Sequence, residues 1–221
     1  MSSYEEIWEK FQETRRLEFG GHTDPTWQHG HKTSASFIVP VEVSYLRSRL
    51  EPVREALEPF PFVSLHPDHF MHITLLILGF LVEEPHDKGE LSHQRLADLA
   101  GRAREALSGF PPFRVHLANV NAFPSAAFVE AHSGGRLEKL QDLLSLECGM
   151  RRPPGPPHLT LAYFHAPNGS AAPEPLISAM DRFRDWPVGE VQVDRVELTL
   201  LDLKEPYPVP QVVAKIPLAG G

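Results

Sequence analysis

The sequence predicts an α+β fold of two pseudo-symmetric lobes, in which antiparallel-dominated sheets flanked by helices surround a central cleft. Two observations predict it. The tetrapeptide His-[Ile/Leu]-Thr-Leu occurs at residues 72–75 and again at residues 158–161, each time in an apolar, strand-like run. Each copy is followed by the same order of predicted elements: loop, helix and strand. This order indicates two similar halves related by an approximate twofold axis.

The first half begins with the apolar residues 72–80. Residues 91–107 then carry apolar side chains at spacings of three and four, which predicts a helix. Ser-Gly at 108–109 and Pro-Pro at 111–112 end this helix. Residues 113–117 alternate between apolar and polar side chains, as expected of a strand.

The second half repeats this order after residues 158–164. A loop at residues 167–170 precedes a helix predicted over residues 173–186, whose apolar residues form one stripe. A proline and a glycine end this helix, and residues 191–193 open the next strand. The two halves match weakly in residue identity, so the repeat lies in the order of elements.

The duplicated domain is predicted over residues 34–221, and residues 1–33 are predicted to be an N-terminal extension. In the extension, residues 3–18 read as an amphipathic helix, because Ser3 and Glu6 have the spacing of a capping box. We see no linker between domains.

Residues 19–33 of the extension are rich in Gly, His and Thr and are predicted to form a loop. Its histidines His22, His29 and His31 have neither a cysteine partner nor a regular ligand spacing, so no metal site is expected there. A flap near the cleft is the alternative for this loop, since many such loops contact substrate.

The two repeated strings carry the chemistry. In a strand, His72 and Thr74 point to the same face, as do His158 and Thr160. A single His-x-Thr in a chain with 12 histidines is typical of a packed structural residue. Two copies at equivalent places in similar halves favour function instead.

Two imidazoles and two hydroxyls in one cleft suit the cleavage of a phosphodiester. One imidazole is expected to act as base while the other, protonated, acts as acid, because imidazole titrates near neutral pH. The threonine hydroxyls are expected to stabilise charge on the phosphoryl oxygens. The scheme uses no metal and no cofactor. The assignment of acid and base stays open, because pseudosymmetry makes the roles interchangeable.

Paired His-x-Thr-hydrophobic strings in a duplicated chain of this length resemble the 2H phosphoesterase superfamily. The likeness is greatest to its bacterial branch, the RNA 2′,3′-cyclic phosphodiesterases often labelled 2′-5′ RNA ligases. Residues 37–40 resemble the family's first core strand, residues 120–131 its segment between the motifs, and residues 137–144 its helix before the second motif. The likeness covers roughly residues 35–215.

The resemblance implies a metal-independent enzyme that hydrolyses the 2′,3′-cyclic phosphates of nucleotides or RNA ends. Its catalytic residues would be His72, Thr74, His158 and Thr160. Three alternatives stay open: a reversible 2′-5′ RNA ligase, a hydrolase of a non-RNA cyclic phosphate, and a nucleotide- or RNA-binding module without turnover. The position of the phosphate on the product is open as well.

The chain departs from the family after the second motif. Bacterial members often carry an arginine there, where this chain has Tyr163 and Phe164. Arg152, upstream of the motif, is the candidate replacement for the phosphate contact, and an ordinary surface arginine is the alternative.

Aromatic side chains are the candidates for contact with a base. Strict alternation along the strand places Phe164, and not Tyr163, on the face of His158. Ordinary core positions are the alternative for each aromatic. The candidates are Tyr163, Phe164, Phe123 and Phe128.

Composition sets the outer limits. The chain has 221 residues, of which 42% are hydrophobic and 23% charged, as in ordinary globular proteins. A net charge of −8 without long basic runs favours a cyclic nucleotide or an RNA terminus over a long duplex. One cysteine, no signal peptide and no membrane-spanning run predict a cytoplasmic protein. We expect a monomer.

Overall fold

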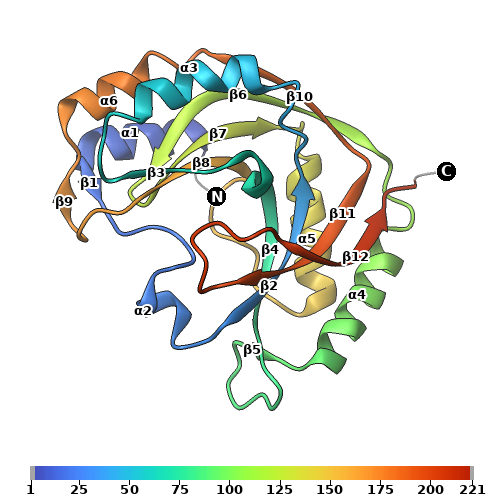
Figure 1. Cartoon of the computed structure of the whole chain (residues 1–221). Coiled ribbons are helices and arrows are strands. Elements are labelled where there is room, and N and C mark those ends of the chain that lie inside the picture. The colour runs from blue at the N-terminus through green and yellow to red at the C-terminus, as the bar shows by residue number, and fades with distance from the viewer. Residues whose placement is uncertain (1–2, 220–221) are drawn as a thin grey trace.

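The computed structural model describes residues 3–219 (Figure 1). The helices are α1 (Tyr4–Thr14), α2 (Pro25–Gln28), α3 (Arg47–Leu57), α4 (His93–Leu107), α5 (Arg136–Cys148) and α6 (Glu174–Asp181), with a 3₁₀ turn at Asp68–Phe70. The strands are β1 (Arg16–Leu17), β2 (Thr33–Pro40), β3 (Val63–Leu65), β4 (His72–Leu81), β5 (Glu90–Leu91), β6 (Phe113–Phe123), β7 (Ala126–His132), β8 (His158–Phe164), β9 (Ser170–Ala171), β10 (Pro187–Val193), β11 (Arg195–Asp202) and β12 (Gln211–Pro217).

One ten-stranded sheet forms the centre of the molecule. Its main path runs β10-β6-β7-β8-β4-β2-β11-β12, with β3 beside β8 and β5 beside β4. Among the strand pairs within residues 3–219, only the short β4–β5 pair is parallel. The predicted α+β class with antiparallel-dominated sheets is therefore confirmed. The path divides into two halves of the sheet, β10-β6-β7-β8 and β4-β2-β11-β12, which meet where β8 adjoins β4. β6, which follows the first motif in the chain, lies in the half of the sheet that holds the second motif.

The helices cover this curled sheet in two groups (Figure 1). α4 and α5 pack on each other and against β12 and β4. α3 and α6 pack on each other and against β10 and β6. The predicted helix over 91–107 begins at His93, because the Ser92 side chain caps it by accepting from the Arg95 amide. The predicted helix over 173–186 ends earlier, at Asp181.

The N-terminal segment lies against the core rather than apart from it. α1 packs against β6 and buries Trp8 and Phe11. Its predicted capping box between Ser3 and Glu6 is confirmed. The helix ends at Thr14, before the residue that adopts a left-handed conformation. The predicted division into residues 1–33 and residues 34–221 stays a prediction. The outermost residues of these two ranges, 1–2 and 220–221, lie outside the described residues.

The alternation along the motif strands separates chemistry from packing. Ile73 and Leu159 are fully buried, whereas the His and Thr on either side of them are only partly buried. The hydrophobic face of each strand thus fixes the direction of its polar face. Among residues 3–219, every helix is too short or too polar to cross a membrane.

Candidate active site

The two motif strands are neighbours at the centre of the sheet. β4 and β8 run antiparallel, and Ile73 lies opposite Leu159, so the middle residues of the two motifs face each other. Side chains directly opposite in such a pair have Cβ atoms about 4.5–5.5 Å apart. The two motifs are thus brought together by direct strand pairing.

This register pairs each histidine with the threonine of the other motif. His72 lies opposite Thr160, and Thr74 lies opposite His158, all on one face. The two histidines are diagonal neighbours, a relation that places Cα atoms about 7–8 Å apart. The four predicted catalytic side chains therefore form one compact group.

The two imidazoles are held by equivalent contacts. Nδ1 of His72 lies 2.7 Å from the Phe70 carbonyl oxygen, and Nδ1 of His158 lies 2.8 Å from the Pro156 carbonyl oxygen. Since a carbonyl only accepts, each Nδ1 carries the proton. Each Nε2 then holds a lone pair and has no protein partner within residues 3–219. Both rings therefore present the same nitrogen, Nε2, as an acceptor.

Burial controls the charge of these rings. Burial lowers the pKa of His72 to about 4, and the nearby His158 and His22 rings add to this effect, while the Phe70 carbonyl opposes it. Burial also lowers the pKa of His158, against the opposing effect of the Pro156 carbonyl. Both histidines are neutral near pH 7. A bound phosphate, being negative, would favour protonation of one of them.

A bulge follows the motif in each strand. Where β4 pairs with β2, Leu75 is an extra residue, and where β8 pairs with β7, Leu161 is the equivalent extra residue. Each bulge shifts the alternation by one residue. Ile77 and Tyr163, three residues after the threonines, therefore return to the polar face.

The bulge overturns one prediction. Strict alternation placed Phe164 on the face of His158, but its side chain is fully buried and stacks with Phe11. The prediction that Phe164 contacts substrate is wrong, because the bulge turns this ring into the core. Tyr163 occupies the open face instead.

A cavity of about 240 Å³ opens beside His72 and Thr74. Its walls include Ile77 of β4 and Tyr163 of β8, together with Phe70 before β4. His158 and Thr160 do not line it and lie across the strand pair. The cavity joins aromatic surfaces to one of the two motif imidazoles.

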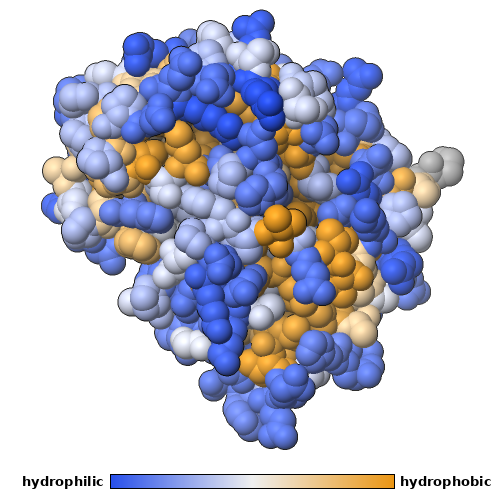
Figure 2. All heavy atoms as spheres, viewed as in Figure 1, coloured by the Kyte–Doolittle hydropathy of each residue, from blue (hydrophilic) through white to orange (hydrophobic). Residues whose placement is uncertain are grey.

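A second, larger cavity of about 400 Å³ also touches His72. It is lined by the charged Arg47 and Asp68 and by the exposed Val209 and Val212. Figure 2 shows hydrophobic side chains gathered over β11 and β12, near this cavity. His72 thus separates an aromatic cavity from a charged and apolar one.

Two further predicted residues surround His158. The half-buried Phe123 lies edge-on to the His158 ring at 5.1 Å, and the buried Phe128 lies 4.8 Å from the same ring. Phe123 and Phe128 stack on each other at 4.5 Å. These rings supply part of the burial that keeps His158 neutral.

Arg152 forms an ion pair with α5 rather than with any residue of the two motifs. Its guanidinium is 2.9 Å from the Asp142 carboxylate of α5. This partner already neutralises the charge, so nothing in these contacts brings it to the motifs. Its predicted phosphate contact stays a prediction.

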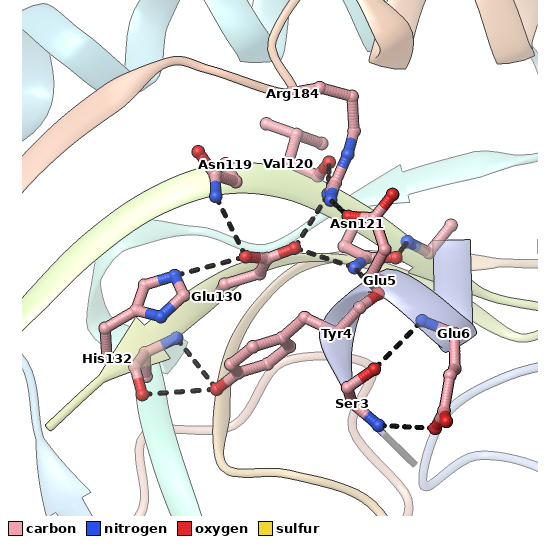
Figure 3. Close-up of polar contacts among 12 residues, drawn as sticks. Ser3, Tyr4, Glu5, Glu6, Asn119, Val120, Asn121, Glu130, His132 and Arg184 are labelled. Carbon is pink, nitrogen blue, oxygen red and sulfur yellow. Dashed lines mark hydrogen bonds and ion pairs between the residues drawn. The ribbon is translucent and has the colours of Figure 1, made fainter. Parts of the chain in front are cut away.

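A buried polar network is centred on Glu130 (Figure 3). It adjoins His158 from the neighbouring strand β7. Glu130 of β7 lies opposite His158 and accepts hydrogen bonds from Asn121 and Arg184. Burial raises the pKa of Glu130, but hydrogen bonds from His132, Asn119, Arg184 and Asn121 outweigh it and lower the pKa to about 2. The carboxylate therefore remains charged.

The hydroxyl of Tyr4 ties α1 to the same region. It donates to the carbonyl of Pro157, directly before His158, and accepts from the Ala131 amide. Tyr4 also packs against Phe128 at 6.4 Å. The N-terminal helix is thereby joined to the start of β8.

The structure also brings the predicted loop 19–33 to the site. Gly21, His22 and Trp27 line the aromatic cavity with His72. The sequence predicts a flap as the alternative for this loop but indicates no role for these three residues. The adjacent glycines 20 and 21 were the signal that its backbone packs closely. Within residues 3–219, no group of His, Cys, Asp or Glu is arranged to hold a metal.

Comparison with known proteins adds a family to this geometry. The model of the 2′-5′ RNA ligase superfamily matches residues 46–205. No curated protein matches the chain.

Several solved structures share the fold. TT0787 of Thermus thermophilus is 24% identical, with a TM-score of 0.59 over 85% of this chain and 98% of that one. LigT of E. coli, solved with 3′-AMP, is 17% identical, with a TM-score of 0.59 over 85% and 99%. A structure described as a phosphoesterase gives a TM-score of 0.62 at 15% identity over 85% and 99%.

The family match covers both motifs, the bulged residues Leu75 and Leu161 that follow them, and the strands β4 and β8 that carry them. The predicted resemblance to the 2H phosphoesterase superfamily and its 2′-5′ RNA ligase-like branch is thus confirmed, and the chain belongs to the 2′-5′ RNA ligase superfamily.

Proposed function

We propose that the protein is a metal-independent phosphodiesterase that hydrolyses 2′,3′-cyclic phosphates on nucleotides or RNA ends. The proposal rests on one observation above the others. Each imidazole has its Nδ1 proton anchored on a carbonyl and its Nε2 free, and each lies beside a threonine hydroxyl. This group contains a base, an acid and two hydrogen-bond donors for one phosphoryl group.

The reaction follows from these roles. One neutral imidazole accepts a proton at Nε2 from a water molecule as the water oxygen attacks phosphorus. The other imidazole, protonated, gives its Nε2 proton to the ribose oxygen as the bond from that oxygen to phosphorus breaks. Hydroxyls of Thr74 and Thr160 donate to the non-bridging oxygens, where negative charge grows. The product is a nucleoside monophosphate with one free ribose hydroxyl.

The comparisons support a nucleotide substrate. E. coli LigT, similar in fold, was solved with 3′-AMP and with NADP⁺. A nucleoside monophosphate is the kind of molecule that the proposed reaction releases. We also propose that the protein acts as a monomer and that it is cytoplasmic. Its one cysteine, Cys148, is buried and unpaired, which suits the reducing compartment of the second proposal.

The experiment is a product analysis with a panel of 2′,3′-cyclic nucleotides and cyclic-ended oligoribonucleotides, with a chelator present. Turnover to monophosphates supports the proposal. Dependence on an added metal contradicts it. Joining of a cyclic end to a 5′-hydroxyl RNA would assign ligation, and nucleotide binding without turnover would assign a binding module.

His116→Ala provides the matched control for this assay. His116 is an exposed strand histidine on β6, so its replacement removes an imidazole without touching the motifs. It is expected to keep wild-type turnover.

A further inference from the structure

The N-terminal segment contributes to the wall of the cavity beside His72. We propose that residues 15–31 complete a nucleobase subsite there, with His22 as its hydrogen-bonding group. The inference rests on the proposed function and names its substrate class: a cyclic nucleotide rather than a base-free sugar phosphate. This segment lies outside the family match, which begins at residue 46.

The segment is attached to one half of the sheet by its backbone. The Glu18 amide donates to the Pro124 carbonyl at 2.8 Å, and the Gly20 amide donates to the Phe164 carbonyl at 2.8 Å. A Cβ on Gly21, whose φ is +108°, would lie 2.8 Å from the Tyr163 ring. Glycine at this position allows the chain to pass directly over the tyrosine.

The same segment is also attached to the other half. The Gln28 side-chain amide donates to the Leu203 carbonyl at 2.7 Å and to the His22 carbonyl at 2.8 Å. Leu203 follows β11, whose loop lies beside α2 in Figure 1. The segment therefore spans both halves, with the cavity between its attachments.

Aromatic surfaces surround this cavity. His22 lies 5.3 Å from the Phe70 ring and 6.1 Å, edge-on, from the Tyr163 ring. Trp27 from α2 forms another part of the wall and meets Phe80 edge-on at 5.1 Å. Flat aromatic walls of this kind bind nucleobases by stacking.

His22 adds one polar group to these walls. Its side chain is 6% exposed, and its Nε2 donates to the Glu205 carbonyl at 2.8 Å. Its Nδ1 is buried and has no hydrogen-bond partner among residues 3–219. Burial lowers the pKa of His22, against the opposing effect of the Glu205 carbonyl, so the ring is neutral and Nδ1 is an acceptor. Buried polar atoms are normally paired, and a base N–H would pair this one.

The test compares two substrates on the whole protein. One is 2′,3′-cyclic AMP, and the other is the 2,3-cyclic phosphate of methyl riboside, which lacks a base. His22→Gln keeps a donor for the Glu205 carbonyl but removes the acceptor at Nδ1. Trp27→Leu removes a stacking surface and serves as the second variant. His29→Asn, at an exposed left-handed position of the same segment, is the control.

We expect each of the two variants to raise KM for cyclic AMP about tenfold, the value of one hydrogen bond or stacking contact. kcat and the rates with methyl riboside cyclic phosphate should not change when each protein is assayed at its own pH optimum, a condition needed because the His22 ring helps to lower the His72 pKa. Equal losses on both substrates, or no loss on either, would overturn the subsite. Thermal unfolding of each variant identifies a general loss of folding, and then the other variant decides.

A calorimetric titration with 3′-AMP keeps this inference separate from the proposed function. If the wild type turns over neither substrate, hydrolysis is wrong, while the subsite still predicts about tenfold weaker binding of 3′-AMP to His22→Gln. Equal binding to both proteins, or no binding to the wild type, would overturn the subsite as well.

Discussion

At the scale of single residues, the carbonyl two positions before each histidine determines its chemistry. By holding the Nδ1 proton, Phe70 and Pro156 leave Nε2 as the reactive atom of both rings. Neither contact was predictable from the motifs, because a carbonyl partner is a backbone property that the residue types do not reveal. The pairing of imidazole with hydroxyl was predictable, because alternation along a strand is strict within three residues.

The lowered pKa values predict an acidic optimum for kcat/KM. The reactive form carries one proton on the pair of imidazoles, and both pKa values lie below the ordinary 6.5, that of His72 at about 4. Activity should therefore fall as pH rises through the higher of the two pKa values, which lies below 6.5, because the pair loses its acid, and fall again as pH drops through the lower one, because it loses its base. In the substrate complex the phosphate raises these pKa values, so kcat should extend to higher pH. A pH profile of kcat/KM that peaks above 7 would contradict this account.

The threonines are expected to act on the transition state. Thr74→Val and Thr160→Val keep the shape of the side chain but remove the donor, so each should lower kcat about 10²-fold with little change in KM. Steady-state kinetics on a cyclic nucleotide measures this. A rise in KM at unchanged kcat would assign the hydroxyls to ground-state binding instead.

At the scale of elements, the paired bulges decide which side chains reach the site. The extra residues Leu75 and Leu161 occupy the same place in both halves and turn Ile77 and Tyr163 toward the cavity. The regular two-residue period of a strand does not hold at this point. A bulge depends on the partner strand, so the motif strand alone gives no sign of it.

The bulge in β8 predicts opposite effects for neighbouring aromatics. Phe164→Ala should lower the free energy of unfolding by about 3–5 kcal/mol, because it empties a fully buried position. Tyr163→Ala should chiefly raise KM, because it removes a cavity wall. Denaturant unfolding and kinetics on both variants test this, and a KM effect confined to Phe164→Ala would contradict the bulged register.

At the scale of the whole molecule, the fold class and the two halves were predictable, whereas their connection was not. The sequence pattern revealed two similar halves but not that β4 and β8 pair directly. The role of residues 19–33 was equally hidden, because their contacts with Tyr163 and Leu203 are distant in sequence. Local periodicity carries no information on such contacts.

The Glu130 network joins α1, β6, β7 and the turn after α6, so it should contribute to global stability (Figure 3). Glu130→Gln should lower the free energy of unfolding at pH 7 by about 3–5 kcal/mol, since Arg184 then lacks its buried partner. The folded-state pKa of Glu130, about 2, lies below the ordinary 4.5. Its stabilisation is therefore present above pH 4.5 and lost as pH falls toward 2.

Unfolding measured from pH 7 to pH 2 checks this prediction. The wild type should lose stability more steeply below pH 4.5 than Glu130→Gln does. Parallel curves for the two proteins would show that Glu130 is not the group responsible.

The central claim is that two imidazoles act together on one phosphorus, and a double-variant comparison tests it most directly. kcat/KM for a 2′,3′-cyclic nucleotide is measured for His72→Ala, for His158→Ala and for the double variant, with His116→Ala as control. We predict that each single variant loses about 10²–10⁴-fold and that the double variant loses little more, because acid and base act as one unit. A single variant within tenfold of the wild type, or losses that multiply in the double variant, would contradict the account.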